Sequence, residues 1–252
     1  RTGAAADGRA ARGALPIPCS GMVGARWGWI GALYAACPAE AASLAAGLVA
    51  LDTASLGRVS FIPGVRQSDD VMRGEETQIF GALASGCADG LFVLPGTHSK
   101  WARVRDSRIE SFTTFMTGDV YAALKDHTIL AAGMADDASE DGFARGLDMA
   151  RALDGPGALL ARLFSLRVAA LDGALSPSQA AGALSGLLIG AELRQMAREA
   201  DGFTLVAGDT LAPRYETAAA AFGLTPRRAP GQCAAQGQYV LAHAAGLIGS
   251  AG

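Results

Sequence analysis

The sequence has little of what metal-binding and disulfide-stabilised proteins use. It holds four cysteines and three histidines in 252 residues, and no two cysteines form a CxxC pair. The cysteines are Cys19, Cys37, Cys87 and Cys233. Because the ligands of a structural zinc site are usually grouped, this scatter argues against a Cys/His metal centre. It predicts reduced, mostly buried thiols in a cytoplasmic protein.

Basic clusters and long apolar runs are also absent. Aromatic residues make up 6% of the chain, the formal net charge is −3, and no block of Lys and Arg alternates with aromatic residues. This composition argues against nucleic-acid binding. The most apolar stretch, residues 180–193, contains Glu192 and is shorter than the roughly 20 residues that a membrane span needs, so it predicts a core helix. Missing Walker A and Gly-x-Ser-x-Gly motifs disfavour P-loop NTPases and α/β-hydrolases.

What is present is a succession of strand-like and helix-like segments. We expect strands that end near Cys19 and that cover about 59–62, 91–94, 101–105, 109–115 and 203–207. We expect helices over about 38–50, 69–83, 117–124, 143–153, 159–166, 178–200, 215–219 and 232–248. The pattern predicts an α/β protein, and the length permits one large domain or two smaller lobes.

The segment from Phe92 to Trp101 is the most informative part of the chain. A hydrophobic strand enters a Pro-Gly turn with hydroxyl residues and a lysine, then leaves through an aromatic residue into a second strand. Gly96 permits close approach to the backbone, while Thr97, Ser99 and nearby N–H groups can donate hydrogen bonds to phosphate oxygens. An ordinary exposed β-turn has the same composition, so that alternative stays open.

A second glycine-containing loop follows the last expected strand. Residues 203–207 run directly into Gly208 and Asp209, and a helix follows. A strand, a glycine loop and a helix in this order offer a nucleotide a close backbone approach and a helix N-terminus.

Two adjacent carboxylates, Glu75 and Glu76, stand at the start of an expected helix. Adjacent helical side chains point about 100° apart, so only one of them can face a ligand squarely. That one could act as a general base that takes a hydroxyl proton as the oxygen attacks a γ-phosphate. Arg73 could pair with a carboxylate or hold an anionic substrate. The alternative is that both glutamates merely interact favourably with the helix dipole.

The segment from Gly21 to Trp29 combines glycines with Arg26, Trp27 and Trp29. Aromatic faces and bidentate guanidinium contacts can hold sugars and sugar acids. The alternative is that both tryptophans are core or interface anchors, because each buries a large apolar area.

These segments together resemble one protein family. The motifs are Gly-Met-Val-Gly-x-Arg-x-Gly-Trp at 21–29, Arg-Gly-Glu-Glu-Thr-Gln at 73–78, Leu-Pro-Gly-Thr-His-Ser-Lys-Trp at 94–101, Met-Thr-Gly-Asp at 116–119 and Leu-Ser-Gly-Leu-Leu-Ile-Gly-Ala-Glu-Leu at 184–193. From about Pro16 onwards the chain is similar to the 2-dehydro-3-deoxygalactonokinase family of the actin-like ATPase sugar kinase superfamily. The resemblance implies a two-lobed, actin-like or ribonuclease-H-like ATPase fold. It also implies transfer of phosphate from ATP, with Mg²⁺, to the 6-hydroxyl of 2-dehydro-3-deoxy-D-galactonate.

The same resemblance implies roles for individual residues. The phosphate-binding hairpin would comprise Gly96, Thr97, Ser99 and Lys100, and the adenosine-binding turn would comprise Gly208 and Asp209. The candidate sugar-acid ligands are Arg26, Trp29 and Arg73, with Arg26 facing the substrate carboxylate. The candidate catalytic carboxylates are Glu76, Glu75 and, in reserve, Asp119, and no metal ligand is assigned.

The resemblance divides the chain into a partial N-terminal sugar-side lobe, residues 1–57, and a C-terminal nucleotide-binding lobe, residues 58–252. Family members open with an Asp-x-Gly-Thr-Thr-Asn turn, and this chain has no such segment, so we expect an incomplete N-terminal lobe. Two functions follow: an ATP-dependent sugar acid kinase, or a non-catalytic relic that binds a nucleotide or sugar acid. The expected partner is a small sugar acid, and a homodimer is left open.

Overall fold

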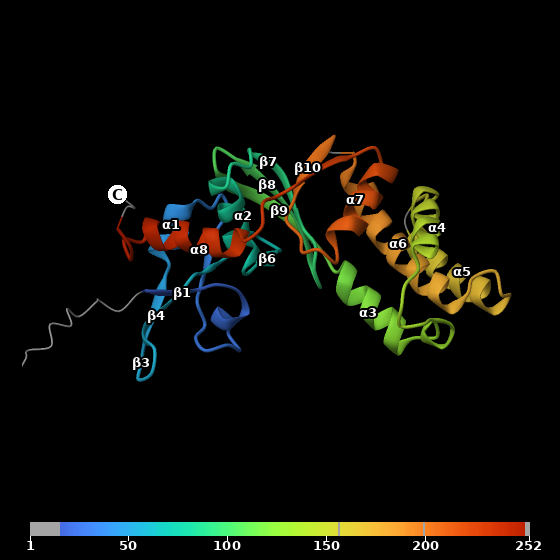
Figure 1. Cartoon of the computed structure of the whole chain (residues 1–252), viewed down its shortest axis with the longest axis horizontal. Coiled ribbons are helices and arrows are strands. Elements are labelled where there is room, and N and C mark those ends of the chain that lie inside the picture. Colours follow the sequence, from blue (N-terminus) through green and yellow to red (C-terminus); the bar gives the residue numbers. More distant parts are fainter. Residues whose placement is uncertain (1–15, 156, 199, 250–252) are drawn as a thin grey trace, which may run out of the picture.

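The computed structural model describes residues 16–155, 157–198 and 200–249. It shows an elongated molecule in which short strands occupy one end, a larger sheet the centre and mainly helices the other end (Figure 1). Residues 1–15 of the predicted first lobe lie outside the described residues. The α/β class expected from the sequence is confirmed.

The central sheet has five strands in the order β11-β10-β7-β8-β9. These are β7 (Gly90–Leu94), β8 (Ser99–Arg105), β9 (Arg108–Phe115), β10 (Gly202–Leu205) and β11 (Thr225–Arg228). Strand β8 runs antiparallel to both of its neighbours, while β7, β10 and β11 are mutually parallel. Residues 91–94 of the middle strand β7 are all buried, as expected for a strand that is covered on both faces.

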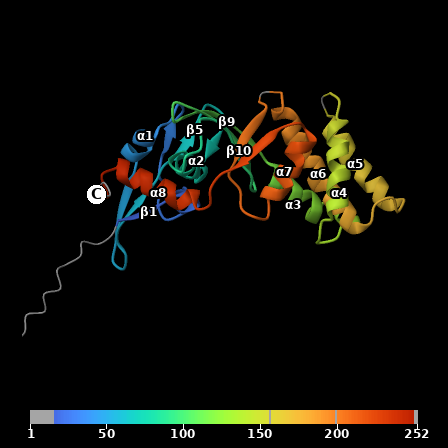
Figure 2. The same cartoon turned by 45° about the horizontal axis from the view of Figure 1, so that its top comes forward.

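Helices cover both faces of this sheet (Figure 2). They are α2 (Glu75–Ala84) and α8 (Cys233–Ala244) on one face and α6 (Pro177–Met196) and α7 (Ala212–Ala221) on the other. Phe92 packs in the first core and Val93 in the second, as the alternation along a strand requires. Helices α2 and α8 approach very closely, since a Cβ added at Gly237 would lie 1.8 Å from the carbonyl oxygen of Thr77.

The helical end of the molecule is built around α6. The other helices there are α3 (Thr117–His127), η2 (Ala131–Gly133), α4 (Glu140–Arg151) and α5 (Ala158–Leu171). Helix α6 begins with a Ser176 capping box and Pro177 at its first position. Residues 180–190 are all buried, which confirms the expected core helix. Among the described residues, no helix has both the length and the apolar character needed to cross a membrane.

Two three-stranded sheets form the opposite end. One contains β1 (Ile17–Cys19), β4 (Gly57–Phe61) and β3 (Val49–Thr53), and the other contains β2 (Tyr34–Ala36), β5 (Gly64–Arg66) and β6 (Val71–Met72). The 3-10 turn η1 (Gly21–Gly24) and helix α1 (Ala41–Ala46) complete this end. The predicted lobe boundary after residue 57 falls inside β4, which pairs with both β1 and β3. That division of the chain therefore stays a prediction.

Most expected elements are confirmed, and the errors have a physical origin. The helix expected over 38–50 is only α1, because residues 49–53 pair as a strand with β4. The helix expected from residue 69 begins at Glu75, because Val71 and Met72 pair with β5. Strand β11 was not expected, since Pro226 and two arginines interrupt any apolar pattern. It is an edge strand, where proline is tolerated.

Candidate functional site

Two loops from distant parts of the sequence meet at one edge of the central sheet. Strands β7 and β10 are parallel neighbours, with Val93 opposite Leu205, and the Val206 N–H donates to the Val93 carbonyl at 2.9 Å. The chain therefore leaves both strands at the same edge. The turn at 95–98 and the Gly208 loop both lie there, at the carboxyl ends of parallel strands, where α/β proteins usually bind ligands.

The first turn of α3 holds the turn at 95–98 in place. The Asp119 N–H donates to the Thr97 carbonyl at 2.9 Å, and a Cβ added at Gly118 would lie only 2.5 Å from the Gly96 carbonyl oxygen. Thr97 and His98 are exposed, and His98 Nε2 lies 3.6 Å from the Asp119 carboxylate. Asp119 is thus brought next to the turn, together with the N-terminus of an 11-residue helix.

The side chains of Ser99 and Lys100 point away from this turn into the protein. The Ser99 hydroxyl donates to the Glu192 carboxylate at 2.6 Å. Lys100 Nζ donates to the Val71 carbonyl at 2.8 Å and to the Thr114 hydroxyl at 2.7 Å. Both residues are buried, so their side chains support the turn from behind.

Two cavities flank this edge of the sheet. One, of about 140 Å³, is lined by Gly96, Thr117, Gly118, Tyr121, Ser185, Leu188, Ile189, Leu211, Arg214 and Tyr215. The other, of about 480 Å³, lies on the side of α2 and α8, and its lining includes Gln78, Pro95, Gly208, Asp209 and Gln232. The turn and the Gly208 loop therefore stand between a small pocket and a larger open one.

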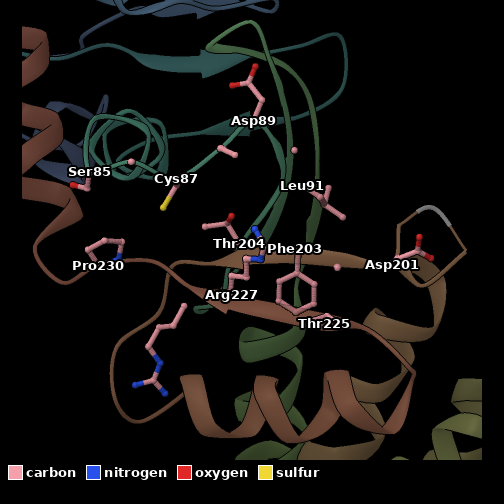
Figure 3. A pocket seen from close by; sticks show the side chains of 15 residues that line it. Ser85, Cys87, Asp89, Leu91, Asp201, Phe203, Thr204, Thr225, Arg227 and Pro230 are labelled. Atoms are coloured by element: carbon pink, nitrogen blue, oxygen red, sulfur yellow. The ribbon is translucent and has the colours of Figure 1, made fainter.

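A third cavity, of about 690 Å³, lies near the amino ends of β7 and β10 (Figure 3). Cys87, Thr204 and Arg227 surround it, and none of the predicted site residues lines it. Because ligands of parallel sheets bind at the carboxyl ends of the strands, its size alone does not make it the functional site.

The Arg73 motif packs against the glycine turn η1. A Cβ added at Gly24 would lie 3.4 Å from Arg73 Nη1, and one at Gly74 would lie 3.1 Å from the Gly21 Cα. The Arg73 guanidinium stacks on the Tyr34 ring, with 4.3 Å to the ring centroid. The structure therefore brings together two motifs that are about 50 residues apart in the sequence.

Part of the Arg73 guanidinium makes no hydrogen bond to any residue that the structure describes. Nη2 donates to the Ala32 carbonyl at 2.7 Å, whereas Nε and Nη1 are buried without such a partner. Buried donors are nearly always satisfied in native proteins. The free N–H groups are therefore suited to an oxygen-rich ligand.

Glu75 and Glu76 both turn back to cap the start of α2. Glu75 accepts a hydrogen bond from the Arg73 N–H at 2.9 Å, and Glu76 accepts one from the Gly74 N–H at 2.6 Å and one from the Thr77 hydroxyl at 3.0 Å. Glu76 is fully buried, and burial raises its pKa from 4.5 to about 7 against the opposing effect of these hydrogen bonds.

Arg26 and Trp29 lie on the surface of the segment that follows η1. The Arg26 guanidinium lies 5.3 Å from the Trp27 ring centroid, and Trp29 meets Phe61 edge-on with centroids 6.3 Å apart. Trp27 is 87% exposed and Trp29 is 60% exposed, so neither is a core anchor, and the alternative that they anchor an interface stays open. Arg26 contacts Trp27 and Arg73 contacts Tyr34, so the common role of the two arginines stays a prediction.

Several residues at this edge were not singled out from the sequence as site residues. They are Thr117, Tyr121, Glu192, Arg214 and Tyr215. Glu192 could have been found, because a carboxylate in an apolar helical run must have buried partners. The others lie on two helices, α3 and α7, and converge only through packing. Within the described ranges, no group of three or more His, Cys, Asp and Glu side chains could hold a metal ion.

Known proteins match the chain over most of its length. A family model described as 2-keto-3-deoxy-galactonokinase matches residues 2–241. The chain is 39% identical over 223 residues to "Probable 2-dehydro-3-deoxygalactonokinase DgoK1" of Rhizobium meliloti (strain 1021). This match covers 84% of this chain and 72% of that protein. It is 38% identical over 238 residues to the 2-dehydro-3-deoxygalactonokinase of Escherichia coli (strain K12), covering 91% and 79% respectively.

A solved structure agrees with these matches. A crystal structure from Sinorhizobium meliloti that carries the same kinase name superposes with a TM-score of 0.83 at 36% identity. The match covers 92% of this chain and 81% of that chain. The chain thus belongs to the 2-keto-3-deoxy-galactonokinase family of sugar acid kinases.

Proposed function

We propose that this protein transfers the γ-phosphoryl group of ATP to the 6-hydroxyl of 2-dehydro-3-deoxy-D-galactonate. Membership of the family and the names of two relatives support the substrate and the reaction class. The observation that carries the proposal is the meeting of the 95–98 turn, the Gly208 loop and the start of α3 at one edge of the sheet. The relatives' names do not favour the alternative of a non-catalytic relic.

The proposal includes a two-lobed, actin-like fold. Its nucleotide-binding lobe would contain the five-stranded sheet. When the strands are numbered in chain order from β7 as 1 to β11 as 5, their spatial order is 3-2-1-4-5 and only strand 2 is antiparallel. This arrangement supports a ribonuclease-H-like unit. The sugar-side lobe would contain the short sheets of the N-terminal end. Four free cysteines in the described chain support the expected cytoplasmic location, and a homodimer stays a prediction.

The nucleotide would bind across the turn at 95–98. Gly96 presents no side chain, Thr97 offers an exposed hydroxyl, and α3 directs its N-terminus at the same place. The cavity of about 140 Å³ would take the purine ring, because Leu188 and Leu211 give it apolar walls and Tyr121 and Arg214 offer flat groups for stacking. Gly208 and Asp209 would contact the adenosine from the neighbouring loop. Mg²⁺ bound to ATP would neutralise charge on the phosphates during transfer.

The sugar acid would bind on the other side of α2. The unpaired Nε and Nη1 of Arg73 would donate to its oxygens, and Arg26 would pair with its carboxylate from the exposed loop. The cavity of about 480 Å³ is lined by Gln78 on α2, by Pro95 at the turn and by Gly208 and Asp209, and the sugar acid and the nucleotide would meet there.

Of the three candidate carboxylates, we assign the role of general base to Asp119. Its side chain is half exposed beside the turn, where it could reach a hydroxyl group. Glu76 is fully buried, and Glu76 and Glu75 accept hydrogen bonds from the backbone at the start of α2. We therefore assign to these two glutamates the role of fixing the Arg73 loop, rather than proton transfer.

An assay of ADP release tests this proposal. The wild type is expected to release ADP with 2-dehydro-3-deoxy-D-galactonate, and the gluconate epimer serves as the comparison substrate. Asp119→Asn is expected to lower kcat by about 100-fold or more. Asp126→Asn, the same change at the other end of α3, is the matched control and should retain activity. ATP binding without ADP release by the wild type would refute the kinase, and full activity of Asp119→Asn would refute the assigned base.

A further inference from the structure

Glu192 is a buried carboxylate that the proposed mechanism does not use. It lies near the end of α6 and is 2% exposed. Its oxygens accept hydrogen bonds from the Ser99 hydroxyl at 2.6 Å, the Trp101 indole N–H at 2.7 Å and the Tyr215 hydroxyl at 3.0 Å, and also from the Thr117 hydroxyl. One carboxylate thereby connects β8, α3 and α7 to α6.

Four donors match the acceptor capacity of an ionised carboxylate, which offers about four lone-pair sites. Trp101 can only donate, so at least one oxygen must stay an acceptor. Burial raises the pKa of Glu192, while its four hydrogen-bonded partners act in the opposite direction. An apolar side chain of similar volume would often serve stability equally well. The four specific hydrogen bonds of Glu192 therefore point to a role other than stabilising the fold.

The donors flank the turn that would hold the phosphates. Ser99 directly follows the turn, and Thr117 is the first residue of α3. Two residues later, the Asp119 N–H donates to the Thr97 carbonyl at 2.9 Å. Glu192 is thus hydrogen-bonded to both segments that flank the turn. Two of its partners, Thr117 and Tyr215, also line the small cavity.

We propose that Glu192 is a positioning residue that fixes the turn at 95–98 and the start of α3 in the geometry needed for phosphoryl transfer. This inference rests on the proposed function. Phosphoryl transfer depends mainly on positioning and charge stabilisation, so a small displacement of Thr97 and Asp119 would slow the reaction strongly. Sugar-acid binding at Arg73 would be little affected, because the hydrogen bonds of Arg73 within the described chain go to Ala32, Leu33 and Glu75 and not to this network.

Thr117→Val tests the inference, because valine keeps the shape of threonine and removes only the hydroxyl that donates a hydrogen bond to Glu192. We expect kcat to fall by about tenfold or more, with KM for the sugar acid within twofold of the wild type. Thr117→Ser restores the hydroxyl and should recover most of kcat. Ser176→Ala, which removes the cap at the far end of α6, is the control for lost stability. It should lower the melting temperature and leave kcat unchanged.

Amide hydrogen exchange gives a readout independent of catalysis. In Thr117→Val, the Asp119 N–H should exchange faster than in Ser176→Ala, because the start of α3 has lost its link to α6. Unchanged protection of this N–H, or a kcat equal to that of the Ser176→Ala control, would overturn the inference. Absence of ADP release by the wild type would instead refute the proposed function, and the exchange measurement would still decide the role of Glu192.

Discussion

The buried carboxylate of Glu76 predicts a pH-dependent stability. Burial raises its pKa from 4.5 to about 7, so between these values the folded protein keeps a proton that the unfolded chain releases. Stability is therefore lost as the pH rises through this window. The difference between the two pKa values corresponds to roughly 3 kcal/mol, an upper bound reached above pH 7.

Glu76→Gln removes the titration and keeps the shape of the side chain. The amide oxygen can accept the Gly74 N–H, and the amide nitrogen can donate to the Thr77 hydroxyl. At pH 8 the variant is expected to be more stable than the wild type by about 1–3 kcal/mol, and near pH 5 the difference should shrink to below about 1 kcal/mol. Urea unfolding followed by circular dichroism from pH 5 to 8 measures both free energies.

Glu75→Gln is the matched control, since it makes the same change at the adjacent position. The charge of Glu75 is the smallest of the causes that act on the Glu76 pKa, so this variant should keep most of the wild-type pH dependence. A Glu76→Gln stability difference that is constant from pH 5 to 8 would show that Glu76 is ionised throughout, and the reasoning from burial would be wrong.

Three further predictions concern close contacts and the free guanidinium. Arg73→Lys loses the planar N–H groups and should raise KM for the sugar acid about tenfold, while KM for ATP stays within twofold of the wild type. Steady-state kinetics measures both constants, and equal changes in the two would contradict the assignment. Gly118→Ala places a Cβ 2.5 Å from the Gly96 carbonyl oxygen and should lower kcat by about 10- to 100-fold; unchanged kcat would show that the turn tolerates displacement. Gly237→Ala places a Cβ 1.8 Å from the Thr77 carbonyl oxygen and should cost roughly 3 kcal/mol in urea unfolding; an unshifted midpoint would refute the close packing of α2 on α8.

Local patterns in the sequence predicted much of the fold. The strand at 91–94, the turn after it and the strand at 101–105 follow from an apolar run, a Pro-Gly pair and renewed alternation. Helix α6 follows from its apolar content and its Ser-Pro start. These signals are encoded within a few residues, so no tertiary contact is needed to detect them. The family motifs predicted the membership that the comparisons then established.

The direction of individual side chains was beyond such patterns. Lys100 stands in a motif typical of phosphate binding, but the register of β8 places it opposite Thr114, where its ammonium group is already hydrogen-bonded. Ser99 likewise faces Glu192, which is 93 positions away in the sequence. Which face of a strand is buried depends on the layer that packs against it, and that layer comes from distant segments.

By itself, the sequence determined the α/β class, the Pro-Gly turn between two strands and the list of polar groups available for chemistry. Only the tertiary structure decided which of these groups are exposed and which are hydrogen-bonded inside the protein, because exposure and hydrogen-bond partners arise from contacts between distant segments. Glu76 became a buried cap, Asp119 came to lie beside His98, and Glu192 joined three elements through four donors. A carboxylate costs free energy to bury, so its partners, and not its position in the sequence, determine what it does.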